Sequence, residues 1–359
     1  MSVIRFHSLP AIEVEERLFQ KWENIHQEQE FSSPFTHPQF TRCLAEVRPS
    51  DTWISIMEAD NEIIGFFPYQ QKRRRRISPL GEFLNDYQAP VAKKGYSWDA
   101  AEWIKQSSFN WFTYNHLPEQ QKSFHRYSPI RTFSPVMEVS GGFDRYLARL
   151  ANIKGKIPGS FTRTDRSKRK RLIDEIGDVV FLSDSRDHEH FQSLLFLKSQ
   201  QYRETGAVDI FAVPWVSQLI GKLFQQRGRG FSGKLSVLMA GDKVVSYHFG
   251  LGSGNVWHYW FPAFDRIYAP YSVGILLLIE MAKAAADEGF DWIDLGRGDQ
   301  RYKMELKTSG YGLQEGILSR PQWRGDLTMR QRVTWTAFKQ SRFGESLKRI
   351  RNVLINRGK

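Results

Sequence analysis

The sequence has a single cysteine, Cys43, and it lacks both a membrane-length apolar run and a leader-like N-terminus. One cysteine excludes an internal disulfide framework and is typical of a reducing compartment. The longest apolar stretch with a helical pattern, residues 274–279, falls far short of the roughly 20 residues that cross a bilayer. The N-terminal residues contain no apolar segment of the kind found in a secretory signal. These absences predict a cytoplasmic protein.

The composition is that of an ordinary globular protein. Hydrophobic residues make up 41% and charged residues 25% of the 359 positions, which excludes a disordered chain, and the length favours two domains. Aromatic residues reach 14%, so we expect either bulky cores or an aromatic-lined cleft.

Positive charge is concentrated in three blocks, residues 72–76, 163–171 and 321–359, and the last holds ten basic against two acidic residues. Such blocks attract polyanions, namely nucleic acid, an anionic bilayer or a phosphorylated ligand, or else they form a solvated surface. The last block has the spacing of an amphipathic helix. It either packs on its own domain or attaches the protein to the inner face of a membrane.

The first half of the chain predicts helices, a hairpin and further short strands. Apolar strands flank an Asp60-Asn61 pair, which is a hairpin signal. The Gly-, Pro- and Lys-rich segment 154–160 is the best candidate for a linker. The expected helices are 14–27, 38–47 and 143–150, and the expected hairpin strands are 53–59 and 62–69.

The order of expected helices and strands in the second half differs from that of a dinucleotide-binding fold. Its elements follow the order α-β-α-α-β-β-β-α-β, which is typical of an α+β arrangement, and it has no glycine-rich dinucleotide or Walker motif. After a basic helix to residue 176, we expect strands at 179–182, 234–240, 244–250, 256–261 and 292–295 and helices at 188–202, 214–226 and 272–288.

The start of the last long helix has the features of a phosphate site. Pro270 precedes the helix, Ser272 is a good N-cap, and Gly274 lets a ligand approach the backbone. The free N–H groups of a first turn, with the positive end of the helix dipole, attract phosphate. The alternative is an ordinary capped core helix.

Two histidines, His248 and His258, fall on adjacent expected strands. A register through the turn at residues 252–255 pairs His258 with Phe249 and places the histidines on opposite faces. We therefore expect each to be structural rather than a shared metal ligand, and no Cys/His cluster indicates zinc.

Residues 268–303 contain the run Tyr-Ala-Pro-Tyr-Ser-Val-Gly-Ile-Leu-Leu-Leu, the run Asp-Leu-Gly-Arg-Gly-Asp at 294–299, and then Tyr302-Lys303. In these residues the chain resembles the BioF-like acetyltransferase family of the GNAT superfamily, with cellulose-biosynthesis acetyltransferases and, more distantly, FemAB aminoacyltransferases as relatives. Weaker likeness extends the resemblance to about Arg320. The usual pyrophosphate loop is not intact, because residues 266–274 keep only an arginine and one late glycine.

The resemblance implies an α+β fold of two tandem GNAT-like lobes, each a mixed, largely antiparallel sheet flanked by helices. Residues 1–153 would form a degenerate first lobe, 154–320 the acyltransferase domain and 321–359 a basic helical tail. The resemblance also implies acetyl-CoA or another acyl-CoA as co-substrate and no metal. The donor would be held by Arg266, Tyr271, Ser272, Val273 and Gly274.

GNAT-like enzymes transfer the acyl group by direct attack in a ternary complex, which needs a base for the acceptor and an acid for the thiolate. Asp299 is our candidate base, Tyr302 the proton donor, and Lys303 the group that holds a phosphate or the oxyanion. His248, Arg297 and Arg301 are the candidates for acceptor binding. The alternative for Asp299 is a plain ion pair with Arg301.

The leading expectation is N- or O-acyl transfer to a sugar or nucleotide-linked sugar in exopolysaccharide or cell-envelope biosynthesis. One alternative is FemAB-like aminoacyl transfer from tRNA, since basic runs suit RNA; otherwise we expect no nucleic-acid partner. The other alternative is a regulator that binds cyclic di-GMP through arginine pairs. Such pairs occur at Arg145/Arg149, Arg297/Arg301 and Arg320/Arg324.

Overall fold

A computed structural model describes residues 3–228 and 230–340, and in this part of the chain thirteen strands form one sheet. Across the sheet twelve strands follow the order β1-β2-β3-β4-β6-β13-β7-β12-β11-β10-β9-β8, and β5 pairs with β3 beside this path. The strands are β1 (Ile4–Pro10), β2 (Thr52–Ala59), β3 (Glu62–Lys72), β4 (Arg76–Pro79), β5 (Val91–Ala92), β6 (Trp111–Pro118), β7 (Ile130–Glu138), β8 (Val179–Leu182), β9 (Phe231–Ala240), β10 (Lys243–Ser253), β11 (Val256–Ala263), β12 (Trp292–Asp294) and β13 (Ser309–Ser319).

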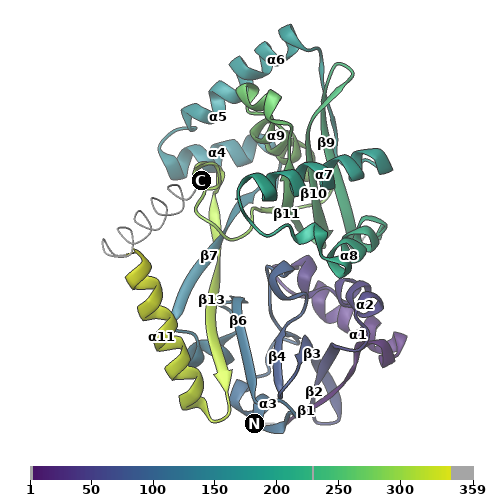
Figure 1. The fold of residues 1–359 in the computed structure, drawn as a ribbon, viewed down its shortest axis with the longest axis vertical. Coiled ribbons are helices and arrows are strands. Elements are labelled where there is room, and N and C mark those ends of the chain that lie inside the picture. Colours follow the sequence, from purple (N-terminus) through teal and green to yellow (C-terminus); the bar gives the residue numbers. More distant parts are fainter. Residues whose placement is uncertain (1–2, 229, 341–359) are drawn as a thin grey trace, which may run out of the picture.

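Helices cover both faces of this sheet in two lobes (Figure 1). The first lobe carries the helices up to α3, and the second carries α4 to α10. The helices are α1 (Glu16–Gln27), α2 (Pro38–Val47), α3 (Ala100–Gln106), α4 (Phe143–Lys154), α5 (Gly159–Arg163), α6 (Arg169–Glu175), α7 (His188–Glu204), α8 (Pro214–Phe224), α9 (Val273–Ala285), α10 (Arg301–Leu306) and α11 (Gln322–Gln340).

The two halves of the chain repeat one plan. Read from either edge, four antiparallel strands lead to a single parallel pair, β4 with β6 in the first lobe and β11 with β12 in the second. Two helices join the first and second strands of each lobe, α1 and α2 in one and α7 and α8 in the other. The prediction of two tandem lobes in a mixed, largely antiparallel α+β fold is therefore confirmed.

The lobes exchange strands at the centre of the sheet. β13, from the end of the second half, inserts between β6 and β7, and β7, from the end of the first half, pairs with β12. Figure 1 shows these two long strands running side by side between the lobes. The boundary predicted at residues 153/154 stays a prediction. It falls in the last turn of α4, which packs in the same apolar cluster as α9.

Apolar clusters lie on both faces of the second-lobe sheet. One contains α4 and α9 with Trp257 and Tyr259 of β11. The other contains α7 and α8, and residues Phe35 and Phe40 from the first half join it. The first lobe thus contributes directly to the core of the second, and α2 packs against α8.

Most predicted elements agree with the structure within a few residues, including the hairpin, whose Asp60 and Asn61 both have positive φ. The strand β1 has no counterpart among the predicted elements. The predicted pairing of Phe249 with His258 is wrong, because a bulge at Tyr259 and Trp260 of β11, opposite Gly250, shifts the register so that Phe249 opposes Phe261. The two histidines nevertheless lie on opposite faces. His258 contacts Phe35, whereas His248 stacks on Tyr259.

The predicted basic tail begins as α11, which packs along β13, and residues 341–359 lie outside the described residues. Among the described residues, no helix has the length and apolar character that a membrane span requires.

Replacing Gly250 with alanine should destabilise the fold. A Cβ there would lie 2.1 Å from the His258 carbonyl oxygen and 2.6 Å from the His248 ring, so the bulge could not form without moving backbone. We expect a loss of at least about 3 kcal/mol in the free energy of unfolding, measured by chemical denaturation. Gly221→Ala is the matched control, since its Cβ meets nothing within 4 Å and a helix favours alanine. Equal stability of the two variants would contradict this account.

Candidate functional site

The second-lobe sheet opens where β11 and β12 separate. The two strands pair in parallel only from Val256 to His258 and from Trp292 to Asp294. β11 then continues to Ala263, while the chain after β12 turns away at Gly296, whose φ is +71°. Backbone groups along this stretch of β11 are therefore available to an extended ligand on the β12 side.

The N-terminus of α9 follows this stretch of β11. Ser272 stands at the predicted N-cap position, but its backbone is left-handed, with a φ of 55°, and its side chain makes no capping bond. The hydroxyl instead accepts a hydrogen bond from Lys168 Nζ at 2.5 Å. Lys168 ends a π-helical turn, Thr164–Lys168, within the basic run 163–171. A lysine and a helix N-terminus thus meet at one place.

The other predicted donor-binding residues divide into two groups. Tyr271 and Val273 are buried, with the Tyr271 hydroxyl donating to Glu175 at 2.5 Å, and a Cβ at Gly274 would lie in ordinary contact with the Phe264 ring at 3.5 Å. Arg266 is exposed and pairs with Glu204 of α7 at 2.7 Å. The guanidinium of Arg266 is thus engaged with α7.

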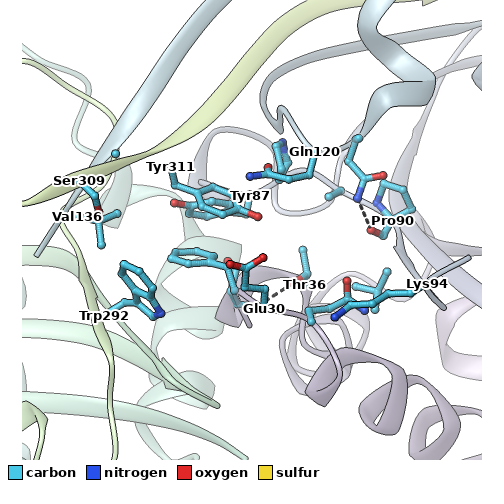
Figure 2. Close-up of a pocket in the computed structure, with 18 residues that line it drawn as sticks. Glu30, Thr36, Tyr87, Pro90, Lys94, Gln120, Val136, Trp292, Ser309 and Tyr311 are labelled. Atoms are coloured by element: carbon cyan, nitrogen blue, oxygen red, sulfur yellow. Dashed lines mark hydrogen bonds between the residues drawn. The ribbon is translucent and has the colours of Figure 1, made fainter. Parts of the chain in front are cut away.

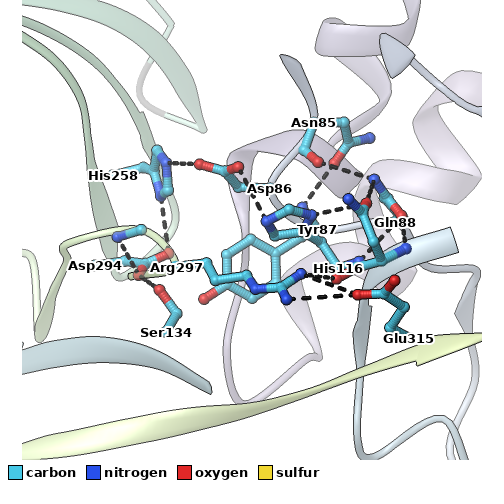
Figure 3. Close-up of polar contacts among 12 residues, drawn as sticks. Asn85, Asp86, Tyr87, Gln88, His116, Ser134, His258, Asp294, Arg297 and Glu315 are labelled. Carbon is cyan, nitrogen blue, oxygen red and sulfur yellow. Dashed lines mark hydrogen bonds and ion pairs between the residues drawn. The ribbon is translucent and has the colours of Figure 1, made fainter. Parts of the chain in front are cut away.

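At the point where β11 and β12 separate, His258 is held between two carboxylates (Figure 3). Its Nδ1 lies 2.8 Å from Asp294 Oδ2, and its Nε2 lies 2.9 Å from Asp86 Oδ2. His258 and Asp294 are fully buried, while the Asp86 side chain keeps 23% of its surface exposed. Asp294 also accepts hydrogen bonds from the Ser134 hydroxyl and from the backbone N–H of Gly296.

These contacts fix the charges of the cluster. Burial alone would lower the pKa of His258, but Asp294 and Asp86 outweigh it and raise the pKa to about 9. Burial alone would raise the pKa of Asp294, but His258 and the hydrogen bonds outweigh it and lower that pKa. At neutral pH, His258 is therefore an imidazolium between two carboxylates.

Asp86 lies on a first-lobe segment that follows β4 and fills the corresponding opening in the first-lobe sheet. β4 and β6 pair in parallel only at Arg76–Ile77 and Trp111–Phe112, as β11 and β12 do in the second lobe. The chain after β4 then returns along β6. The Gln88 N–H donates to the His116 carbonyl at 3.0 Å, and Gln88 Oε1 accepts from the N–H groups of Asn115 and His116. The segment that closes one opening thus delivers Asp86 to the other.

The predicted catalytic residues lie at different depths. Lys303 is buried, and its Nζ donates to the carbonyls of Gly296 and Arg297 at 3.0 and 3.3 Å, while burial lowers its pKa. Tyr302 is half-buried against the apolar cluster of α9, and burial raises its pKa to about 12. Asp299 is exposed in the loop before α10. Their roles stay predictions.

The candidates for acceptor binding are also engaged with protein groups. Arg297 donates to the Asn115 carbonyl at 2.8 Å and pairs with Glu315 of β13. Arg301, 88% exposed, pairs with Glu305 at 2.7 Å, and the described residues include no ion pair between Arg301 and Asp299, so that alternative is wrong. Glu305 lies four residues after Arg301 on α10, the spacing at which two side chains of a helix face each other.

His248 is fully buried and neutral. Burial lowers its pKa well below the usual value, and its Nε2 accepts the backbone N–H of Trp260 at 3.1 Å. Nδ1 has no hydrogen-bond partner within the described residues. As a binding residue for the acceptor it stays a prediction.

An aromatic cavity of about 420 Å³ lies between the lobes, as the composition led us to expect (Figure 2). Phe31 stacks on Tyr311 at 4.2 Å, and Tyr87 lies against Tyr311 on one side and His258 on the other. Apart from Glu30 and Lys94, the polar groups that line the cavity are uncharged. Its polar and aromatic lining includes Gln29, Glu30, Phe31, Ser33, Tyr87, Lys94, Gln120, Gln121, Trp292, Ser309 and Tyr311.

The prediction from the sequence missed Asp86 and treated His258 as merely structural. Asp86 falls in a segment without regular structure, so no periodicity marks it, and its partner is 172 positions away. The one available signal was the Asp294 that opens the Asp-Leu-Gly-Arg-Gly-Asp run, since a carboxylate at the end of a buried strand needs a partner.

Residues 159–304 match the family model described as an acetyltransferase (GNAT) domain. Among solved structures the chain is similar to FemX, with 8% identity, a TM-score of 0.57, and coverage of 89% of this chain and 99% of that one. It is also similar to the C-terminal domain (DUF2156) of a protein of Agrobacterium fabrum assigned as a lysylphosphatidylglycerol synthetase, with 9% identity, a TM-score of 0.52, and coverage of 87% and 94%. A conserved protein of unknown function from Bacteroides thetaiotaomicron matches with 11% identity, a TM-score of 0.52, and coverage of 88% and 100%. A comparison with curated proteins finds no significant match.

The match of residues 159–304 to an acetyltransferase (GNAT) domain supports an acyltransferase, and the prediction of such an enzyme is confirmed at that level. A GNAT domain implies an acyl-CoA co-substrate. The structural likenesses show a shared fold, since their identities are low.

Replacing His258 with glutamine should destabilise the protein in a pH-dependent way. The variant leaves Asp86 and Asp294 without their cation, which at neutral pH should cost about 3 kcal/mol of unfolding free energy. Because the folded-state pKa of about 9 exceeds the ordinary 6.5, the stabilisation is complete below pH 6.5 and is lost as pH rises through about 9.

Denaturation curves of wild type and variant between pH 6 and 10 would measure this difference. It should shrink steadily across the range, whereas replacing the exposed His7 with glutamine should change stability little at any pH. A difference for His258→Gln that is constant across the range would contradict an imidazolium between two carboxylates.

Proposed function

We propose that the protein transfers an acyl group, most simply acetyl, from CoA to an amine or hydroxyl of a sugar or nucleotide-linked sugar. Transfer proceeds by direct attack in a ternary complex. The observation that carries the proposal is the meeting of Lys168 and the α9 N-terminus beside the opening between β11 and β12.

The donor fits this place on physical grounds. The diphosphate of CoA is an anion, and the free N–H groups and positive dipole end of α9, with Lys168 adjacent, stabilise an anion. The amide-containing arm of CoA can then extend along the unpaired stretch of β11, whose backbone groups complement it. This path leads from the α9 N-terminus towards His258.

The acceptor class is supported by the cavity between the lobes. A sugar ring offers apolar faces and neutral hydroxyls, which match aromatic walls such as Tyr87 and Trp292 and amides such as Gln120 and Gln121. A role in exopolysaccharide or cell-envelope synthesis rests on the resemblance of residues 268–303 to the BioF-like family.

The alternatives have weaker support. Aminoacyl transfer from tRNA rests on the basic runs and on a distant family likeness. Cyclic di-GMP binding would need arginine pairs that are free to bind a ligand. Arg149 is bonded to the Glu138 and Ser140 carbonyls, and Arg297 and Arg301 are engaged with Glu315 and Glu305.

Replacing Lys168 with alanine should weaken CoA binding by about tenfold or more, because it removes one charge-assisted contact to the diphosphate. Isothermal calorimetry with CoA and acetyl-CoA would measure the change. Lys170→Ala is the matched control, since Lys170 lies two residues further on, in α6, and pairs there with the exposed Asp174. Absence of CoA binding by the wild type, with binding of tRNA or cyclic di-GMP instead, would replace the proposal with the corresponding alternative.

The same titration should give one CoA per chain. Although both lobes repeat one plan, Gln88 and its neighbours occupy the first-lobe opening, so only the second can receive a donor. A stoichiometry of two would show that the first lobe also binds the donor.

A further inference from the structure

His116 and Asp86 face each other without a hydrogen bond between them. His116 Nε2 lies 3.7 Å from Asp86 Oδ1, beyond hydrogen-bonding distance, although both side chains are largely buried. Nearby backbone N–H groups determine which atom of each neighbouring side-chain amide is the oxygen. These assignments in turn determine which ring nitrogen of His116 carries a proton.

The orientation of Gln88 is fixed first. Its Oε1 accepts from the backbone N–H groups of Asn115 and His116, at 2.9 and 3.1 Å, so the opposite atom is the amide nitrogen. That Nε2 donates to Asn115 Oδ1 at 2.9 Å and to the Asn85 carbonyl at 3.2 Å. Asn115 Oδ1 is therefore an acceptor.

The tautomer of His116 follows. Its Nδ1 lies 2.9 Å from Asn115 Oδ1, and a contact with an acceptor requires a proton on Nδ1. Burial lowers the pKa of His116, and the positive charges of Arg297 and His258 act in the same direction. The carboxylates Asp86 and Asp294 oppose this effect without outweighing it. A neutral ring with a proton on Nδ1 has its lone pair on Nε2, aimed at Asp86.

Asp86 cannot turn away to relieve this juxtaposition. Its Oδ2 is bonded to His258 Nε2, and the His258 ring is itself held by Asp294 through Nδ1. Oδ1 is thereby held towards His116. His116 Nε2 and Asp86 Oδ1 are then both hydrogen-bond acceptors, so a group that binds between them must be a donor.

We propose that the acceptor substrate places its reacting amine or hydroxyl between His116 Nε2 and Asp86 Oδ1, and that His116 is the general base. This inference rests on the proposed acyl transfer. Asp86 is a positioning residue that orients the acceptor and stabilises the imidazolium formed on His116, and Asn115 and Gln88 set the tautomer.

The step balances without a further reagent. His116 Nε2 takes the proton from the acceptor nitrogen or oxygen as that atom attacks the thioester carbonyl carbon. The carbon–sulfur bond breaks and the CoA thiolate leaves. The proton then passes from His116 to the thiolate, which yields the thiol and restores the neutral ring.

The place suits the donor path as well. Asp86 is bonded to His258, which marks the point where β11 and β12 separate, so the base lies beside the inner end of the opening. Asp299, the base predicted from the sequence, is exposed in the loop before α10.

The first test is the tautomer of His116 in the free protein, read from imidazole nitrogen chemical shifts by NMR at pH 7. We expect a neutral ring with its proton on Nδ1. A ring protonated on Nε2, or on both nitrogens, would overturn the inference, because neither can accept a proton there.

The second test is turnover of acetyl-CoA, followed as CoA thiol release with glucosamine and with water as acceptors. His116→Gln should lower kcat about 100-fold or more while the calorimetric Kd for acetyl-CoA is unchanged. His125→Gln, which alters an exposed histidine bonded to the Glu119 carbonyl, is the matched control. Retention of more than a tenth of the rate in His116→Gln, or a comparable loss confined to Asp299→Asn, would overturn the inference.

The pH profile separates a base from a structural residue. The wild type should lose activity as pH falls through a His116 pKa below 6.5. Asn115→Asp keeps the acceptor for Nδ1 but adds a negative charge, so the acidic limb should move to higher pH; an unmoved limb would contradict the assignment. Failure of the wild type to bind acetyl-CoA would instead refute the proposed function, and the tautomer would still decide the inference.

Discussion

The contact of His258 with Asp294 and Asp86 is the constraint on which the arrangement of the site depends. It joins a strand residue of the second lobe to a loop residue of the first through a buried charge. Removing any member would leave a charge in a region from which water is largely excluded. The relative placement of the lobes at the site is therefore set by an interaction that tolerates little change.

Both lobes share one plan, yet the family match covers residues 159–304 and not the first lobe. Each lobe has a parallel pair that separates, but the first lobe places its own residues 85–88 in the gap. A segment that fills a ligand site satisfies the same backbone groups a ligand would satisfy. In the first lobe, a segment of the chain itself thus takes the place of a ligand. The same segment carries Asp86, which contacts His258 of the second lobe.

Much of the fold could be predicted from the sequence because it depends on local patterns. The Asp60-Asn61 turn, the apolar face of α2 and the run before α9 each signal their structure within a few residues. The bulge opposite Gly250 could not be predicted, because β10 is buried on both faces along most of its length, so its apolar pattern does not mark one face. Nor could the pairing of Asp86 with His258, since no local pattern encodes a contact between a loop and a strand 172 positions apart.

The exchange of β7 and β13 has a consequence for synthesis on the ribosome. Chains fold from the N-terminus as they emerge, usually one unit at a time. Here the sheet of the first lobe joins that of the second only through β13, whose residues 309–319 are among the last of the described chain to appear. The edge of β6 therefore stays unpaired until almost the whole chain has been synthesised. During that interval it is an unpaired strand that another molecule could join, so slow translation or a stalled ribosome would favour aggregation over folding.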